Sequence, residues 1–502
     1  LGLRIDVPFF MTDLQSNDKV AAETYRDGIK IDVSKYPNAK PQFSPRFGFN
    51  YKPFDDENGS LQIRGGTGLF TGTPPYVWIS NQAGNNGVLF GDLNVRAVKD
   101  KNDNIISDGR PSLGFTGNMD TYKPAEGSAT RSDIAITDPD FKYPSLWKSN
   151  IAADYKFGDG WVATIELLYS KDINAIYHDN IGLYRTEQFV NDGGAGNARP
   201  YYNGYYSDRE GNQKAANHVV MLRNTSKGHS LYTTFQLQKN FVDGILKGLY
   251  LNGSYSFGQS RGVTDGTSSV ATSAWKYRAA LDGNAEEVGY TAGSFDGRLL
   301  LSASYTANWS KYAATSFGLI YQRYRPFRYS YCYNGDANGD SQFSNDLMYI
   351  PANFDEVKDH LLPGDFDSQE DAWKAMNAFI EQDPYLSKHR GEYAERNGAV
   401  APFANQLDLS VSHDIKIYQK NGRSHTLRFS FNIANFLNLL NRNWGVVQTT
   451  VLGNQQYQFL TIPKGQGPSA ANNYTLKYTM AKDLDETFKD NLNDVSRWQP
   501  QF

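Results

Sequence analysis

Runs of about ten residues in which apolar and polar side chains alternate recur between Trp147 and Phe436, two at a time with a short turn between them. In the run 249–257, for example, Leu249, Leu251, Tyr255 and Phe257 alternate with Tyr250, Asn252, Ser254 and Ser256. Successive side chains of a β-strand point to opposite faces, so each run predicts a strand with one apolar and one polar face. The chain is therefore expected to be all-β and built from hairpins.

The same pattern extends to both ends of the chain. It predicts about fourteen strands, most of them near the length that a tilted strand needs to cross a bilayer. The predicted strands are 1–7, 43–51, 61–70, 146–157, 161–177, 229–241, 249–257, 298–309, 315–324, 406–418, 425–436, 455–462, 474–480 and a last one that enters Phe502.

The connections between these strands fall into two classes that alternate along the chain. The short ones are 53–60, 158–160, 242–248, 310–314 and 419–424, and the long ones include 71–145, 179–228, 259–296 and 325–405. Outer-membrane β-barrels have short turns at the periplasmic end and long loops outside. The pattern therefore predicts a transmembrane antiparallel β-barrel with long extracellular loops. A soluble propeller or sandwich would share the alternation of side chains but not this alternation of loop lengths.

Composition excludes several other classes of protein. No run of about 18 apolar residues is present, as a transmembrane helix would need, and the mean hydropathy is -0.58. The 33 Tyr, 29 Phe and 45 Gly suit a barrel, whose strands carry aromatic residues at both interfaces. A net charge of -4 offers no basic surface for nucleic acid. Cys332 is the only cysteine, so no internal disulfide can form.

Charged residues at polar-face positions indicate the width of the barrel. A narrow barrel fills its interior with side chains, whereas a wide one encloses water or a plug. The charged positions Glu166, Asp408, Asp414, Lys416 and Arg428 therefore favour a wide barrel. One long connection also contains helical spacing at 367–383, with Ser368 and Asp371 as a capping pair, and this helix is expected to pack on its own loop.

A candidate calcium loop lies in the same long connection. Asp336, Asn338 and Asp340 place oxygen ligands at alternate positions, as in the first half of an EF-hand loop. The match is incomplete, because Ser341 stands where Gly is usual and Leu347 where a bidentate Glu is expected. Asp346 could replace that Glu. The alternative is a hydrated, turn-rich loop without a metal.

Aromatic and arginine residues gather in two parts of the loops. Aromatic faces and guanidinium groups bind sugars and peptides well, so these residues are candidate ligand contacts. An aromatic girdle at the membrane interface, with Arg at headgroup depth, would give the same pattern. The candidate residues are Tyr205, Tyr206, Arg323, Arg325, Arg328 and Tyr329.

The sequence offers no catalytic constellation. Ser260 lies in Gly-Gln-Ser-Arg-Gly, which formally matches the nucleophile elbow of serine hydrolases, but that motif requires a strand-to-helix turn. Residues rich in Gly, Thr and Ser follow Ser260 instead of a helix. We therefore expect no enzyme.

Several segments together resemble one family. They are 41–51 (PQFSPRFGFNY), 64–72 (RGGTGLFTG) with 78–82 (WISNQ), 170–177 (SKDINAIY), 345–351 (NDLMYIP), 379–386 (FIEQDPYL), 391–398 (GEYAERNG) and 435–441 (NFLNLLN). In order and content they are similar to TonB-dependent receptors of the Oar-like type, which are found in outer membranes of the Bacteroidota kind. The resemblance covers nearly the whole chain.

The resemblance implies a barrel of about twenty-two strands closed by an N-terminal plug. It also implies coupling to the inner-membrane TonB complex. On that basis residues 1–502 are expected to be the C-terminal part of the barrel, because the chain starts in a strand and shows no plug. The implied partners are outer-membrane lipids, the plug domain of the same full-length protein, the TonB complex and, as a further candidate, a surface lipoprotein.

The sequence thus predicts an outer-membrane transporter that takes up a large or scarce ligand, such as a peptide, an oligosaccharide or a chelate. Two alternatives stay open. One is a self-contained passive channel of fourteen strands, and the other is a structural or adhesive surface protein whose barrel only displays its loops.

Overall fold

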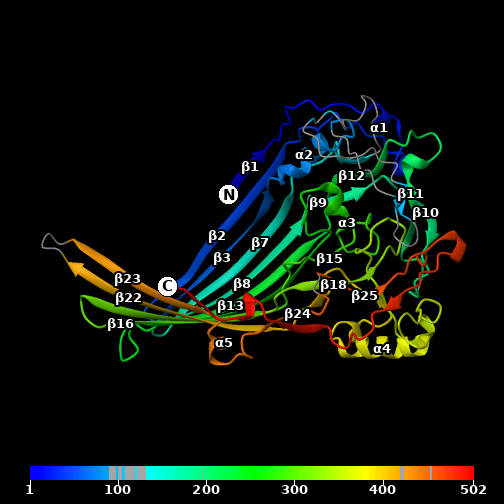
Figure 1. Ribbon diagram of the computed structural model, residues 1–502. Coiled ribbons are helices and arrows are strands. Elements are labelled where there is room, and N and C mark those ends of the chain that lie inside the picture. Colours follow the sequence, from blue (N-terminus) through cyan, green and yellow to red (C-terminus); the bar gives the residue numbers. More distant parts are fainter. Residues whose placement is uncertain are drawn as a thin grey trace.

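One large curved antiparallel sheet, here called the wall, dominates the molecule (Figure 1). The computed structural model describes residues 1–89, 98–99, 105–107, 118, 120, 132–194, 196–418, 423–452 and 455–501. Within these residues the wall has 13 strands, with β15 (Gly289–Tyr290) attached to β14 beside the main path. In spatial order the path is β1 (Gly2–Asp6), β2 (Gln42–Asp56), β3 (Gly59–Thr71), β7 (Ser145–Phe157), β8 (Trp161–Asp172), β13 (His229–Asn240), β14 (Leu249–Gly262), β16 (Arg298–Asn308), β17 (Ala313–Tyr324), β22 (Ala404–Tyr418), β23 (Ser424–Ala434) and β28 (Gln499–Gln501).

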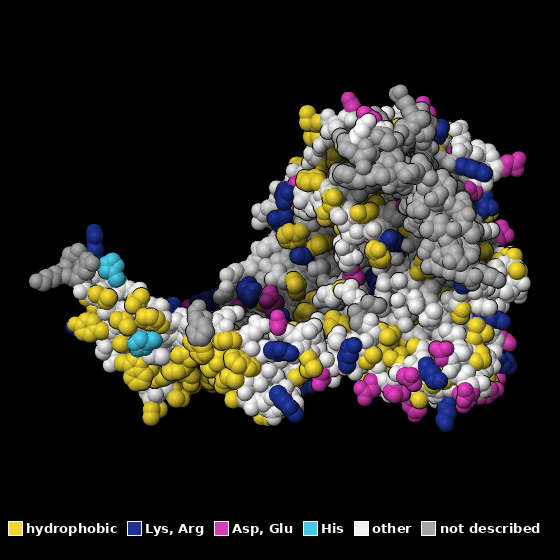
Figure 2. Space-filling model, in the orientation of Figure 1, with side chains coloured by type: hydrophobic (Ala, Val, Ile, Leu, Met, Phe, Trp, Pro, Cys, Tyr) yellow, Lys and Arg dark blue, Asp and Glu magenta, His cyan; other side chains and the backbone are white. Residues whose placement is uncertain are grey.

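The register of the wall places the apolar side chains of neighbouring strands on one face. Leu237 of β13 lies opposite Gly253, which lies opposite Leu301 of β16. Phe235 and Leu301 remain 46% and 43% exposed, far more than a packed core would allow. Figure 2 shows apolar side chains gathered over β22 and β23, at the lower left. This outer face confirms the apolar side of the predicted alternation.

The opposite, inner face of the wall is polar and partly charged. Arg64 pairs with Asp154 at 2.9 Å, and Arg428 pairs with Asp414 at 2.6 Å. Hydroxyl and amide side chains also form hydrogen bonds between neighbouring strands on this face. The hydroxyl oxygens of Thr234 and Ser256 lie 2.9 Å apart, and the side chain of Gln236 donates to that of Asn252 at 2.7 Å. The charged positions that favoured a wide barrel therefore lie on this face.

The two classes of connection lie at opposite ends of the wall, as predicted. Short turns join β2 to β3, β7 to β8, β13 to β14 and β16 to β17, while the predicted turn 419–424 lies partly outside the described residues. The long connections gather at the other end, at the upper right and right of Figure 1. We call the described residues of 72–144, 173–228, 263–297, 325–403 and 435–498, together with 7–41, the loop layer.

The loop layer contains short helices and small sheets. Its strands are β6 (Ser132–Thr137), β9 (Ala175–Asn180) and β12 (Ala216–Thr225) in one sheet, β10 (Leu183–Phe189) with β11 (Pro200–Tyr205), β18 (Arg328–Asn334) with β21 (Ala399–Val400), β25 (Gln456–Thr461) and β26 (Thr479–Met480), β19 (Tyr349–Ile350) with β20 (Glu392–Tyr393), β24 (Val447–Thr450) with β27 (Phe488–Asn491), and β4 (Val98–Lys99) with β5 (Ile105–Ser107). Its α-helices are α1 (Asp18–Ala22), α2 (Tyr76–Gly84), α3 (Ala271–Lys276), α4 (Gln369–Gln382) and α5 (Phe436–Leu440). Short 3-10 helices lie at Arg26–Gly28, Tyr206–Asp208 (η3), Phe354–Glu356, Leu386–Lys388, Ala470–Asn472 and Asp494–Ser496.

The buried apolar clusters of the molecule lie in the loop layer. The largest one packs β18, β25 and α4 together, and Phe379 of α4 lies 4.8 Å from the ring of Phe459. Ser368 caps α4 by accepting from the amide of Asp371, which confirms the predicted helix and its capping pair. No helix within the described residues is long and apolar enough to span a membrane.

Three predicted strands differ from the structure. The predicted strand 161–177 breaks at Asn174, whose side chain donates to Ser145 at 2.7 Å, and its last part becomes β9 in another sheet. The predicted strands 455–462 and 474–480 shorten to β25 and β26, which pair with each other in the loop layer rather than in the wall. Alternation specifies that a segment is a strand, but it does not specify which sheet the strand joins.

Candidate functional site

A cleft of about 410 Å³ opens at the loop-layer end of β16 and β17. Residues 292–298 form one side, and residues on β17 and just beyond it form the other. A chain of hydrogen bonds crosses the inner face of the wall here. Arg298 donates to Gln322 at 3.3 Å, and Gln322 and Tyr324 both donate to the amide oxygen of Gln406. The cleft therefore combines a polar, hydrogen-bonding floor with aromatic and charged walls.

Two of the predicted ligand residues, Arg325 and Arg328, line this cleft. Arg325 lies 3.2 Å from Asp296 and donates to the carbonyl of Ala401 at 2.8 Å. Arg328 is buried, donates to the carbonyls of Ser294 and Asn397, and has its pKa lowered by that burial. Arg328 therefore fixes the shape of the cleft, while Arg325 keeps part of its surface open to it.

Arg323 and Tyr329 point away from the cleft. The guanidinium of Arg323 lies 4.5 Å from the ring centre of Phe403, at a register position on the outer face of the wall. This is the place that an interfacial girdle residue would occupy. Tyr329 is 1% exposed in the largest apolar cluster, with its hydroxyl 3.3 Å from that of Tyr331. The ring of Tyr329 is therefore part of the apolar core of the loop layer.

Tyr205 and Tyr206 lie in a different part of the loop layer from the arginines. Tyr205 ends β11 and packs edge-on against His218, with ring centres 5.1 Å apart. Tyr206 begins η3 and packs edge-on against Tyr184 at 5.2 Å. The six predicted residues are thus divided among the cleft, the outer face and three apolar clusters of the loop layer.

The candidate calcium loop folds into a compact acidic cluster. Oxygen atoms of Asp336, Asp340 and Asp346 lie within 4.8 Å of one another. Asn338 is buried beside them and donates to Asp340 at 3.4 Å. Burial raises the pKa of Asp340 to about 7, and the negative charge of Asp336 adds to this rise. The structure therefore brings the four residues of the motif together.

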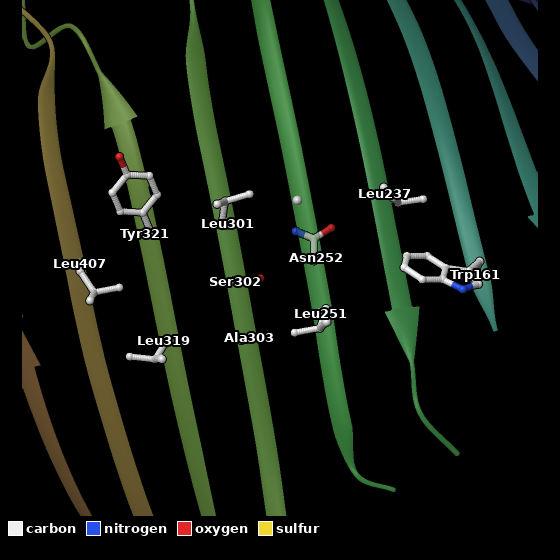
Figure 3. Close-up of a pocket in the computed structure, with 11 residues that line it drawn as sticks. Trp161, Leu237, Leu251, Asn252, Leu301, Ser302, Ala303, Leu319, Tyr321 and Leu407 are labelled. Atoms are coloured by element: carbon white, nitrogen blue, oxygen red, sulfur yellow. The ribbon is translucent and has the colours of Figure 1, made fainter. Parts of the chain in front are cut away.

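A second hollow, of about 440 Å³, lies on the outer face of the wall. Figure 3 shows the side chains of Leu237, Leu301, Leu319 and Leu407 on neighbouring strands around it. Its floor is Gly253, which has no side chain and lies between larger residues of β13 and β16. An apolar hollow among exposed leucines is suited to hydrocarbon chains rather than to a polar ligand.

Ser260, the formal nucleophile of the hydrolase-like motif, lies inside β14 opposite Ser230. Its amide donates to Ser294 Oγ at 2.9 Å. The strand continues to Gly262, so Ser260 does not lie at a turn into a helix.

A family model described as an outer membrane beta barrel domain matches residues 10–463. The chain belongs to this family. The barrel domain is thus a transmembrane antiparallel β-barrel of the outer membrane, as the alternation of strands and loops predicted. The apolar outer face of the wall meets lipid, and the loop layer corresponds to the long external loops.

Weak similarity links the barrel domain to solved structures. A mutant of the ferric enterobactin receptor PfeA from Pseudomonas aeruginosa is 9% identical, with a TM-score of 0.36 over 83% of this chain and 36% of the receptor. The outer membrane transporter YddB from Escherichia coli is 10% identical, with a TM-score of 0.38 over 83% of this chain and 39% of YddB. The FrpB iron transporter from Neisseria meningitidis (F3-3 variant) is 6% identical, with a TM-score of 0.27 over 78% of this chain and 42% of the transporter. The barrel domain thus spans less than half the length of each of these three proteins. No curated protein matches.

Several cleft and cluster residues were missed by the sequence reasoning. Asp296 and Arg298 belong to the cleft but follow a Gly-rich loop without a recognisable motif. Arg199, which pairs with Asp346 at 3.0 Å, is 147 residues away along the chain, and only the fold brings them together. Asn345 directly precedes Asp346 in the acidic motif, so the sequence places it beside the predicted ligands although it was not counted among them.

Proposed function

We propose that the barrel domain is the wall and external face of an active transporter that captures a large or scarce ligand at the cell surface. The observation that carries the proposal is the cleft at the loop-layer end of the inner face, where polar, aromatic and charged groups converge. Ligand sites commonly combine an aromatic lining with a few placed polar groups in a volume of about 300–1,000 Å³. The cleft has this character.

We further propose that uptake is coupled to the TonB complex through a plug domain of the same full-length protein. The resemblance to Oar-like receptors supports this, as does an inner face whose ion pairs and amides suit a water-filled or plugged lumen. A binding event at the cleft would shift the plug between closed and open arrangements. Transport, rather than catalysis, is the function that this arrangement supports.

Whole cells that carry or lack the full-length gene provide the test. A fluorescent ferric catecholate, a labelled oligopeptide and a labelled oligosaccharide are offered as probes, with and without a protonophore. At least one probe should accumulate only in cells with the gene, and the protonophore should abolish that accumulation. Accumulation that persists with the protonophore would instead indicate a passive channel, and binding without accumulation would indicate an adhesive protein.

A pair of variants connects the probe to the cleft. Arg298→Gln removes a positive charge that is exposed in the cleft. Uptake of the identified probe should fall by about tenfold, because the variant loses one hydrogen bond between the ligand and a charged group. Arg442→Gln makes the same change at an exposed position after α5 and should leave uptake unchanged. Equal uptake by both variants would exclude the cleft as the capture site.

A further inference from the structure

The loop 336–346 turns its acidic side chains inward through two residues with positive φ. Gly339 has a φ of +83° and Ser341 one of +68°. This backbone lets the amides of Asn338 and Gly339 donate to one oxygen of Asp336 while the amide of Ser341 donates to the other. Asp340 accepts from the amide of Gln342 in the same way. The carboxylates are thus held in fixed orientations before any ligand is considered.

The carboxylates of the cluster carry more negative charge than the fold neutralises. Asp340 and Asp346 are both completely buried. Asp346 pairs with Arg199 at 3.0 Å, but Arg199 also pairs with Asp192 at 3.0 Å. Asp336 and Asp340 form no ion pair with any residue that the structure describes. Two carboxylates, those of Asp192 and Asp346, therefore share the guanidinium of Arg199, while Asp336 and Asp340 have no cationic partner among the described residues. Buried charge without a partner is strongly unfavourable.

A second, independent feature is the amide of Asn345, which lies at the edge of the same cluster. The residue is 2% exposed, and its Nδ2 lies 3.4 Å from Asp340 Oδ2, so the amide group faces the carboxylates. Its side-chain oxygen, Oδ1, finds no hydrogen-bond donor among the described residues. Leaving a buried acceptor without a partner costs about 1–3 kcal/mol. Rotation of the amide by half a turn would point this oxygen at Asp340, and a cation between the two groups would make that orientation favourable.

We propose that Asp336, Asp340 and Asp346, together with the amide oxygen of Asn345, bind one calcium ion. Calcium takes six to eight oxygen ligands in flexible geometry, and carboxylates and amide carbonyls are its usual protein ligands. Magnesium demands a tighter octahedral shell and keeps more of its water, so it fits a cluster of buried carboxylates less well. The two positive charges of the calcium ion would offset the negative charge that Arg199 does not neutralise.

The ion would stabilise the contacts between several segments of the loop layer. The amide of Tyr202 in β11 donates to the carbonyl of Asn338 at 2.7 Å, and that of Ala280 donates to the carbonyl of Asn345 at 2.9 Å. The carboxylate of Asp346 itself accepts from the amide of Ala337 at 2.9 Å. Charge repulsion inside the cluster would push against all these contacts. Calcium therefore stabilises the packing of 336–346 on β11 and on the segment around Ala280.

The full chain in detergent micelles, freed of metal with a chelator, provides the direct test by isothermal titration with calcium chloride. External calcium-binding modules have dissociation constants of about 10⁻⁴–10⁻³ M, so the titration extends to about 10 mM. We expect one ion per chain and at least a tenfold lower response to magnesium. Absence of saturable calcium binding in this range would overturn the proposal, and equal affinity for magnesium would overturn the choice of ion.

Two variants locate the ion. Asp340→Asn keeps the shape of the side chain but removes its charge, and should weaken calcium binding at least tenfold. Asp359→Asn, at an exposed position of the same long connection, should bind like the wild type. Equal binding by Asp340→Asn would place the ion elsewhere and exclude this site.

A measurement on the wild type covers the case in which Asp340→Asn does not fold. Limited trypsin digestion of the loop layer should slow about tenfold when 2 mM calcium chloride is added to the metal-free chain, in the range where such sites fill. An unchanged digestion rate would contradict the proposal that calcium stabilises the loop layer. Uptake is not measured in any of these experiments, so their outcome is independent of the transport proposal.

Discussion

His178 in β9 shows how burial of one side chain gives the loop layer a pH dependence. Its ring is 3% exposed and lies edge-on to Trp78, with ring centres 5.5 Å apart. Burial lowers the pKa of His178 to about 4, and the positive charge of Arg278 adds to this effect. In the unfolded chain its pKa is about 6.5. Between about pH 4 and 6.5 the unfolded chain therefore binds more protons, and the loop layer loses stability as the pH falls through this range.

Lowering the pH from 7 to 4 should reduce the free energy of unfolding of the loop layer by about 1–3 kcal/mol through His178 alone. His178→Gln cannot take up this proton, so its stability should change less over the same range. Chemical unfolding in detergent, followed by tryptophan fluorescence at each pH, measures the difference. His229→Gln, at the start of β13, is the control and should keep the wild-type dependence. A variant His178→Gln with an unchanged pH dependence would contradict the assignment.

The acidic cluster shows which site residues a sequence can and cannot supply. The spacing of Asp336, Asn338 and Asp340 is local, and a turn-rich loop of that length brings such side chains together by itself. Arg199 depends on long-range packing and carries no motif. Tyr329 looked like a surface aromatic because the sequence does not show that β18 is covered by α4 and β25.

Helix α4 is the element on which the largest apolar cluster of the loop layer is built. Its sequence specifies it well, because Ser368 caps it and its apolar residues recur at helical spacing. The buried face of the helix carries Met376, Phe379 and Ile380. Phe379 contacts the rings of both Tyr457 and Phe459 of β25. The contact partners, 78 or more residues away in sequence, could not be predicted from the helical pattern.

Replacing Phe379 with Ala should leave a cavity between α4 and β25. Such substitutions in packed cores typically cost about 3–5 kcal/mol, and the loop layer should lose stability by this amount. Glu381→Ala changes an exposed side chain on the same helix and should alter stability by less than about 0.5 kcal/mol. Protease sensitivity and chemical unfolding of the loop layer measure both variants. A loss below about 1 kcal/mol for Phe379→Ala would mean that the helix is not packed as described.

At the scale of the whole molecule, the two faces of the wall meet different environments. Adjacent residues Phe235 and Gln236 of β13 point to opposite faces, since Phe235 is exposed among apolar neighbours and Gln236 bonds to Asn252 inside. Placing Arg at a lipid-facing position near the bilayer midplane costs about 2–4 kcal/mol, whereas positions in the lumen tolerate charge.

Phe235→Arg should therefore reduce the amount of heat-modifiable, folded barrel in outer-membrane fractions, while Gln236→Arg should leave it near the wild-type level. Both variants add the same side chain at the same depth, so a general effect of arginine is controlled. Semi-native gel electrophoresis of membrane fractions measures the folded amount. Equal effects of the two substitutions would contradict the assignment of the outer face to lipid.

The sequence alone determined that the chain forms β-strands, which face of each strand is apolar, and that short and long connections alternate. These properties are local, because side-chain alternation and turn residues follow from neighbours along the chain. Only the tertiary structure decided which strands join the wall, why Arg328 and Tyr329 are buried, and that Arg199 pairs with Asp346 of the acidic cluster. Those outcomes depend on contacts between residues far apart in sequence, for which a single sequence carries no local signal.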